Sequence, residues 1–448
     1  MTVGPGADPA GPPVDADKPV SRGPEPSYRA LLNVPWLPRI LTSMILARIS
    51  QSMVSIALVL FTLTEYHSPS LAGAVTLASI LPGLLVSPIA GALLDRHGRM
   101  RLIVLDYTVA MASMALIAVL SIAGLLPPWL LILIAILSSL TSILSVTGIR
   151  SLFPIIVPKS LWERANAIDS NGYVVATIIG PPLAAGLVAV VGGQIALFVT
   201  AIGFGAAAVA LIGVPDPETA VSSTGRILRD ALDGVRYAWG NRTIRGLAFS
   251  ISSLNIGGGI TTIVVPLLVI TRLGYSEALV GVVFALSGVA GMGSALAFGR
   301  LDTRGREWRL LVAPMIGIAP AVALLLVPAA IEDIEPAVGL LFLAGWALIS
   351  GFLNGPMDIA LFTIRQRRTD PAWTGRAFAV SMAMNFIGFP IGAAIAGALA
   401  EESLTTALVP AVAACVLGLV FAVTLVPRTD PALEPGRRAA AAARATEP

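Results

Sequence analysis

The chain has 448 residues, of which 56% are apolar and only 12% are charged, whereas about 25% of the residues in a typical soluble domain are charged. Such a chain cannot bury its apolar side chains in one soluble core, so the composition excludes an ordinary soluble protein. The net charge of +3 does not indicate a nucleic-acid partner, because the basic residues mark membrane topology instead. The single cysteine, Cys415, excludes an intramolecular disulfide and indicates no metal site.

The two ends of the chain are predicted to be tails. Residues 1–35 are rich in proline, glycine and aspartate and lack the apolar region of a signal peptide, so we expect a disordered tail. Residues 428–448 form a second tail after the last apolar stretch.

Twelve apolar stretches lie between the tails. Because about 20 apolar residues cross about 30 Å of hydrocarbon, each stretch is long enough to be a transmembrane helix. The stretches cover 36–63, 70–94, 101–126, 128–153, 165–191, 194–214, 245–271, 277–299, 309–330, 336–363, 375–399 and 404–427. The sequence therefore predicts an all-α polytopic membrane protein.

The basic residues predict the orientation in the membrane. All of the 29 lysines and arginines except Arg48 and Arg272 fall in the tails or in the loops on the same side as the tails. Short loops rich in lysine and arginine stay in the cytoplasm. We therefore expect a multi-pass protein of the cell membrane with both termini cytoplasmic.

The chain divides into two halves, 36–214 and 245–427, joined by a linker at 215–244. Within the linker, apolar and charged residues alternate with the period of an amphipathic helix, which is expected to lie on the membrane surface. The simplest role for this segment is that of a connector between two six-helix bundles.

Two motifs recur in the second half at nearly the same offset. Residues 95–99 (DRHGR) match 302–306 (DTRGR) at an offset of 207, and 179–185 (IGPPLAA) match 387–393 (IGFPIGA) at an offset of 208. Since six spans separate the copies, the halves are predicted to be parallel repeats related by an axis along the membrane normal. Such a protein has a cleft between its halves near the membrane midplane.

The first of these motifs carries a family resemblance. Residues 91–101 (GALLDRHGRMR) resemble the loop motif of the major facilitator superfamily, and they depart from it at Met100, where a basic residue is usual. The resemblance covers 36–427 and implies two pseudo-symmetric bundles that rock about a central site. It also implies a latch in which Asp95 reaches the start of the eleventh helix, mirrored by Asp302 at the start of the fifth. The latch residues are Gly91, Asp95, Arg96, Gly98, Arg99, Arg164, Asp302, Gly305, Arg306 and Arg376.

A second motif lies in the fifth span. Gly180, Pro181 and Gly186 resemble the antiporter motif of exporters in the same superfamily, with alanine at two of the usual glycine positions. Residues 158–186 as a whole look like the drug and siderophore exporter branch. Close helix packing explains the same small residues equally well, and this also applies to Gly388 and Pro390 in the eleventh span.

Charged and polar residues inside the spans are the remaining candidates for function. Ionisable groups in a membrane usually line a cavity or pair with each other, so Arg48 is expected to meet Asp106, Asp169 or Asp358. The same three aspartates are candidates for proton coupling. The other predicted cavity residues are Gln51, Ser55, Asn255, Thr262, Asn354 and Asn385.

These observations predict a monomeric secondary active transporter that exports small amphipathic molecules, such as drugs or siderophore-like compounds, by alternating access coupled to protons. Two alternatives stay open: a lipid or lysolipid flippase of the same fold, and a membrane scaffold that transports nothing. An enzyme is not expected, because the only two histidines, His67 and His97, fall in loops and no phosphate-binding loop is present. No cofactor and no metal are predicted, and the substrate, the coupling ion and the direction are left open.

Overall fold

The computed structural model describes residues 28–216, 227–300, 303, 305–369 and 374–429. Within this part of the chain, twelve helical segments are long and apolar enough to cross a membrane. The predicted all-α polytopic fold is therefore confirmed.

The N-terminal half contains the first six spans. They are α2 (Leu37–Tyr66), α3 (Pro69–His97), α4 (Arg99–Ile122), α5 (Pro128–Ile156), α6 (Trp162–Val191) and α7 (Gly193–Leu211). Tight turns let successive helices reverse direction: Ser68 caps α3 by accepting a hydrogen bond from the Leu71 N–H at 3.2 Å. Gly98 and Gly192 adopt positive φ angles of 92° and 86° between helices, a conformation that glycine adopts without steric cost.

The C-terminal half repeats this order with more interruptions. The helices are α9 (Arg242–Leu267), which continues as a π-helical turn (Leu268–Arg272), α10 (Glu277–Phe298), α11 (Glu307–Ala323) with the short α12 (Leu326–Ala330), α13 (Pro336–Arg367), α14 (Thr374–Phe386), α15 (Gly388–Ala400) and α16 (Leu404–Leu425). The eleventh span is thus broken into α14 and α15. Between the halves lies α8 (Ile227–Gly240), the helix of the linker.

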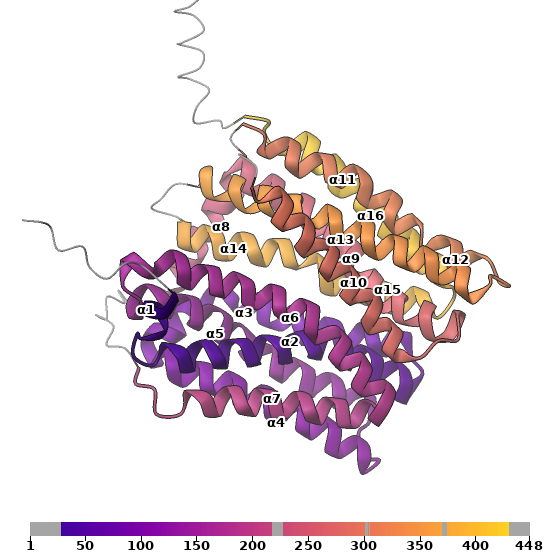
Figure 1. Cartoon of the computed structure of the whole chain (residues 1–448), viewed down its shortest axis with the longest axis horizontal. Coiled ribbons are helices and arrows are strands. Elements are labelled where there is room, and N and C mark those ends of the chain that lie inside the picture. The colour runs from indigo at the N-terminus through magenta and orange to yellow at the C-terminus, as the bar shows by residue number, and fades with distance from the viewer. Residues whose placement is uncertain (1–27, 217–226, 301–302, 304, 370–373, 430–448) are drawn as a thin grey trace, which may run out of the picture.

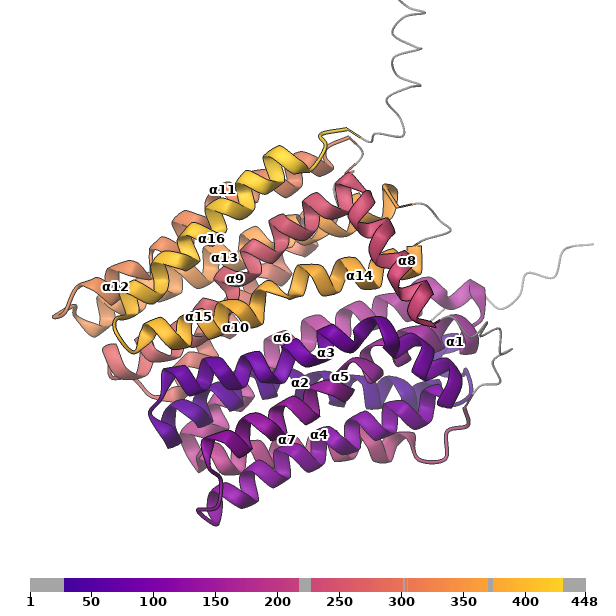
Figure 2. The ribbon, with the colours of Figure 1, turned by 180° about the vertical axis from the view of Figure 1, so that it is seen from behind.

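The two halves lie side by side with their helices running in roughly the same direction (Figure 1, Figure 2). The short helix α1 (Tyr28–Leu32), α8 and the end of α16 lie at one end of the bundle, which we name the basic end because Arg96, Arg99 and Arg242 lie there. The opposite end, near α12, carries Glu332 and Glu335 and is named the acidic end.

Small residues bring the two halves into direct backbone contact toward the acidic end. A Cβ atom added at Gly73 of α3 would lie 2.5 Å from the Ala393 carbonyl oxygen and 3.0 Å from the Gly397 Cα of α15. A Cβ added at Gly281 of α10 would lie 2.6 Å from the Pro182 Cα of α6. Because larger side chains would hold these helices apart, glycine at these positions permits the contact.

Within the C-terminal half, α15 packs closely on α9. A Cβ added at Gly388 would lie 1.9 Å from the Ser252 carbonyl oxygen, and one added at Gly392 would lie 2.0 Å from the Ile256 carbonyl oxygen. Pro390 follows the break in the eleventh span and is buried. Its ring supplies no N–H for the helix ladder, so the interruption lies where the backbone hydrogen bonds are already incomplete.

The structure differs from the sequence-based expectation at three points. Residues 28–32 of the predicted disordered tail form α1, because Leu31 is fully buried in the core. Arg365, which the span boundary at 363 places in a basic loop, lies within α13, since this helix extends several residues beyond the apolar stretch. Arg150, which was counted with the basic loop although the stretch 128–153 includes it, lies within α5. Residues 1–27 of the first tail and 430–448 of the second lie outside the described residues.

Gly392→Ala is expected to destabilise the protein, because its Cβ would overlap the Ile256 carbonyl oxygen and force α15 away from α9. The cost is about 1–3 kcal/mol, as for other overpacked positions, and it would be measured as a lower thermal midpoint of the detergent-purified protein. Gly186→Ala is the matched control, since no described atom lies within 4 Å of a Cβ at that position. Equal midpoints for the two variants would contradict the packing.

Candidate functional site

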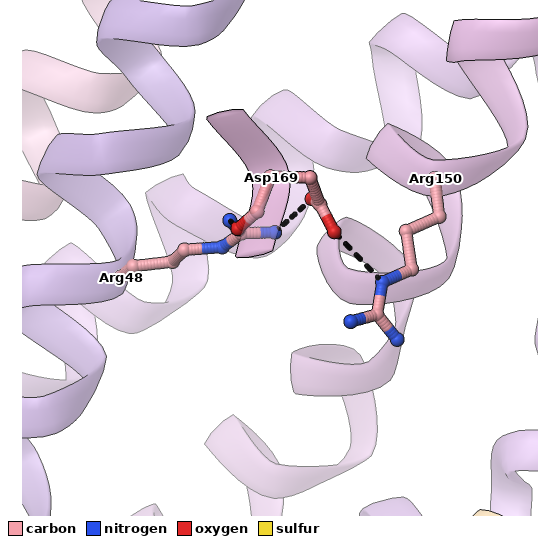
Figure 3. A network of polar contacts seen from close by, with 3 residues as sticks. All are labelled: Arg48, Arg150 and Asp169. Carbon is pink, nitrogen blue, oxygen red and sulfur yellow. Dashed lines mark hydrogen bonds and ion pairs between the residues drawn. The ribbon is translucent and has the colours of Figure 1, made fainter. Parts of the chain in front are cut away.

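An ion pair inside the N-terminal half joins the first and fifth spans. Arg48 of α2 donates one hydrogen bond from Nη2 to the Asp169 carboxylate and another from Nη1 to the Asp169 backbone carbonyl of α6 (Figure 3). Both side chains are only 11% exposed. Of the three aspartates that the sequence offers as partners for Arg48, the structure brings Asp169 to it.

A second guanidinium shares the same carboxylate. Arg150 of α5 places its Nε 3.5 Å from Asp169 Oδ2, and its side chain is 44% exposed. The ring of Tyr173 lies beside both cations, 3.7 Å from the Arg48 Cζ and 5.1 Å from the Arg150 Cζ, so each guanidinium gains a cation–π contact. Three helices are therefore joined through Asp169, and the cluster of two arginines and one aspartate carries one excess positive charge.

Sequence reasoning missed Arg150 and Tyr173. Asp169 and Tyr173 are four residues apart in a helix and therefore share one face, a signal that could have pointed to Tyr173. Arg150 was counted as a topology marker, because an arginine near the end of a span reads equally well as a loop residue.

Asp106 occupies a separate, smaller site. It is 3% exposed in α4 and accepts a hydrogen bond from the Ser145 backbone N–H of α5 at 3.2 Å. It lines a cavity of about 30 Å³ together with Gln51, Ser139 and Ser142, which is enough room for a water molecule. The structure thus places Gln51 beside Asp106 and keeps Asp106 away from Arg48.

A buried polar cluster in the C-terminal half surrounds the break in the eleventh span. Asn255 of α9 donates to the Asn385 backbone carbonyl at 2.8 Å. The Asn385 amide lies between Arg365 Nη2 at 2.5 Å and the Ser381 carbonyl at 3.1 Å. Arg365 is 1% exposed, and its Cζ lies 5.6 Å from the ring of Phe362. The structure therefore brings the predicted residues Asn255 and Asn385 together around an arginine that the sequence did not single out.

The remaining predicted cavity residues separate into two groups. Ser55 in α2, and Asn354 and Asp358 in α13, are exposed in the middle or inner part of their spans. Because polar groups facing hydrocarbon are costly, these residues stay candidates for lining a water-filled space. Thr262 is buried and donates to the Gly258 carbonyl of its own helix at 2.9 Å, so the structure does not support its placement in a cavity.

The first basic loop is held by a residue that was not predicted. The Asp216 carboxylate accepts a hydrogen bond from the Met100 N–H at 2.9 Å, where it caps the N-terminus of α4 and adds a favourable charge at the positive end of the helix dipole. It approaches Gly98 so closely that a Cβ there would lie 2.3 Å from Asp216 Oδ2. Arg96 is exposed and Arg99 is partly buried.

The predicted latch itself lies largely outside what the structure describes. The surroundings of Gly91, the side chains of Asp95 and Arg376 and the whole of Asp302 are not described, so their contacts stay predictions. In the second basic loop Gly305 and Arg306 are exposed, and Glu307 forms an ion pair with Arg367 of α13. Arg164 is partly buried, and no ion pair joins it to another described residue.

The residues of the predicted packing motif in α6 differ in the neighbours that they contact. Gly180 packs against α2, since a Cβ there would lie 2.5 Å from the Ser52 Cβ. The Pro181 carbonyl oxygen would lie 3.1 Å from a Cβ at Gly281 and therefore faces the C-terminal half. Gly186 has no described atom within 4 Å of an added Cβ, so the packing prediction is wrong at that position because the residue points away from its neighbours.

Asp169→Asn is expected to destabilise the protein more than Arg48→Gln. The first change leaves two adjacent guanidinium groups without a counter-charge, whereas the second leaves Asp169 paired with Arg150. Removing one partner of a buried pair costs about 3–5 kcal/mol, so the thermal midpoint of detergent-purified Asp169→Asn should fall clearly below that of Arg48→Gln. Arg48→Gln combined with Asp169→Asn should recover part of the loss, and strictly additive effects would contradict the pairing.

Comparisons with known proteins agree with this architecture. A family model described as Major Facilitator Superfamily matches residues 40–377. The chain is 37% identical over 410 residues to the uncharacterized MFS-type transporter y4rN of Sinorhizobium fredii, which covers 90% of this chain and 98% of that protein. It is 25% identical over 345 residues to the multidrug efflux pump Tap of Mycolicibacterium fortuitum, with 74% of this chain and 81% of that protein covered.

Solved structures show the same fold at low sequence identity. The nucleoside transporter NupG superposes with a TM-score of 0.68 at 13% identity, covering 88% of this chain and 98% of that one. A bacterial homologue of the lysosomal transporter Spinster superposes with a TM-score of 0.65 at 13% identity, covering 90% and 96%. With its twelve spans, its two six-helix halves and its match to the family model, the chain belongs to the Major Facilitator Superfamily of membrane transporters, which are not enzymes.

Proposed function

We propose that this transporter exports small amphipathic molecules from the cytoplasm by alternating access of a central site to the two sides of the membrane. The observation that carries the proposal is the position of the charged cluster relative to the contact between the halves. Asp169 and Pro182 both lie on α6, about 20 Å apart at 1.5 Å per residue. The halves meet at Pro182, so the cluster lies on the basic-end side of a closed contact.

The orientation of this arrangement follows from charge. The basic end carries the arginine-rich loops, which stay in the cytoplasm, so both termini are cytoplasmic. The contact near the acidic end then closes the path to the outside, and the polar groups near Arg48, Ser55 and Asp358 are reached from the cytoplasm. A rocking motion that opens the contact at Gly73 and Gly281 would release a bound molecule outward.

Two observations favour export over import. The Gly-Pro pair of the exporter-like motif, Gly180 and Pro181, lies where α6 contacts both α2 and the C-terminal half, so it occupies a joint that must change when the halves rock. Relatives at 24–25% identity include multidrug efflux pumps named Tap. The scarcity of charged groups in the spans favours amphipathic cargo over sugars, which need more hydrogen-bonding partners.

Locking the acidic end should stop transport. Cys415 is the only native cysteine, so the test uses a Cys415→Ala background carrying Ala185→Cys and Gly281→Cys. A Cβ at Gly281 would lie 2.9 Å from the Ala185 Cβ, within about an ångström of the usual disulfide separation. Oxidation should form the crosslink and abolish efflux from proteoliposomes, because the halves can no longer separate there, and reduction should restore it.

The control pair is Gly186→Cys with Gly281→Cys. Gly186 follows Ala185 in α6 but points away from the C-terminal half, so this pair should not crosslink. Wild-type efflux by the fully crosslinked Ala185→Cys and Gly281→Cys protein would refute the rocking mechanism.

Proton coupling is the second part of the proposal, and Asp358 is the residue best placed for it. Asp169 is held by two arginines, and Asp106 is buried against Ser145. Asp358 is exposed, and no hydrogen bond or ion pair joins it to another described residue. A carboxyl group in this position can take up and release a proton without breaking an ion pair.

Asp358→Asn should therefore retain substrate binding but lose the acceleration of transport by an imposed pH gradient, because asparagine cannot carry the proton. Transport into proteoliposomes with and without a gradient measures this, and Asp106→Asn serves as the comparison. If Asp358→Asn responds to the gradient as the wild type does, another group or another ion couples transport.

A further inference from the structure

We propose that Arg150 is the recognition residue for an oxyanion, so that the transported amphipathic molecules carry a carboxylate, sulfonate or phosphate group. This inference deepens the proposed export function, and the statement that the anion is transported rests on that function. The binding site itself is argued from the geometry of the charged cluster alone.

The two arginines of the cluster differ in what they have left to donate. Arg48 uses both terminal nitrogens on Asp169, one on the carboxylate and one on the backbone carbonyl. Arg150 uses Nε toward Asp169 Oδ2, and its two Nη atoms have no hydrogen-bond partner among the described residues. Figure 3 shows these two nitrogens directed away from Asp169. Both terminal nitrogens of Arg48 are therefore engaged, whereas those of Arg150 form an unused edge.

The unused edge is oriented before any ligand arrives. Two contacts restrict the plane of the guanidinium group. One is the ion pair between Arg150 Nε and Asp169 Oδ2, and the other is the ring of Tyr173, 5.1 Å from the Arg150 Cζ. The Nη pair of a fixed guanidinium forms a fork that matches two oxygens of a carboxylate, sulfonate or phosphate group. Lysine in the same place would offer a single point charge without this geometry.

The charge of the cluster selects the sign of the ligand. Among the described residues, one carboxylate balances one of the two guanidinium groups, and the excess positive charge lies on a membrane-spanning helix, where an unbalanced charge is costly. An anionic ligand neutralises this excess, whereas a cationic ligand adds to it. Recognition of an anion is therefore favoured by the protein's own need for a counter-charge.

The same chemistry could come from a solute or from the phosphate of a membrane lipid, and the experiment separates them. The probes are fluorescein, which carries a carboxylate and is anionic, and rhodamine methyl ester, which shares its three-ring skeleton but is cationic. Binding is measured by fluorescence anisotropy on the full-length protein in detergent, and transport is measured in phosphatidylcholine proteoliposomes.

The wild type should bind fluorescein more tightly than the rhodamine ester, and Arg150→Gln should weaken fluorescein binding by about tenfold or more, the loss expected for a charge-assisted hydrogen bond. Arg150→Lys keeps the charge and should give an intermediate loss, which also guards against a folding defect in the glutamine variant. Arg242→Gln, which removes an exposed arginine at the basic end, should leave fluorescein binding unchanged.

Three outcomes would overturn the proposal. Equal affinity for the two dyes, or undiminished fluorescein binding by Arg150→Gln, would remove the oxyanion site. Displacement of fluorescein by a short-chain phosphatidylglycerol, with no fluorescein transported, would assign the edge to lipid headgroups instead.

The transport arm separates this inference from the proposed function. Efflux of the rhodamine ester without efflux of fluorescein would leave export standing and refute the anionic substrate class. Arg150-dependent binding of fluorescein without efflux of either dye would leave the oxyanion site standing and count against export.

Discussion

The neutralisation of charge inside the membrane is the constraint on which the arrangement of the N-terminal half depends. A guanidinium group cannot lose its water of hydration in hydrocarbon without a partner, and Arg48 finds that partner on another helix. Because Asp169 also contacts Arg150, one carboxylate fixes the relative positions of α2, α5 and α6. Among the described residues, the same contact leaves one positive charge unbalanced, and the two Nη atoms of Arg150 have no hydrogen-bond partner.

The C-terminal half meets the same constraint by a different route. Arg365 is fully buried and is approached by the Asn385 amide and the Phe362 ring. An amide and an aromatic ring therefore contribute to stabilising this guanidinium group, whereas a carboxylate contacts Arg48 in the N-terminal half. The break between α14 and α15 places the Asn385 backbone carbonyl where Asn255 can donate to it. Among the described residues, the repeat of the sequence is therefore accompanied by different side chains around the two arginines Arg48 and Arg365.

Glycine supplies the second condition for the proposed mechanism, which requires that the halves approach and separate. Gly73, Gly281 and Gly397 allow backbone contact near the acidic end without interlocking side chains, and such a contact can open without extracting large groups from pockets. Gly388 and Gly392, by contrast, hold α15 against α9 within a single half. Small residues thus serve both the contact between the halves and the packing inside one of them.

The sequence by itself determined the number of spans, the division into halves and the fold, because the length of an apolar stretch and the charge of its loops are set by the membrane and not by neighbouring helices. It also narrowed the partner of Arg48 to three aspartates. Only the tertiary structure decided that Asp169 is the partner, that Arg150 joins it and that Asp106 lies apart with Gln51, since these outcomes depend on which helix faces meet. For the same reason the structure supports neither Thr262 as a cavity residue nor Gly186 as a packing residue: composition shows that a residue is polar or small, but only packing decides the direction in which it points.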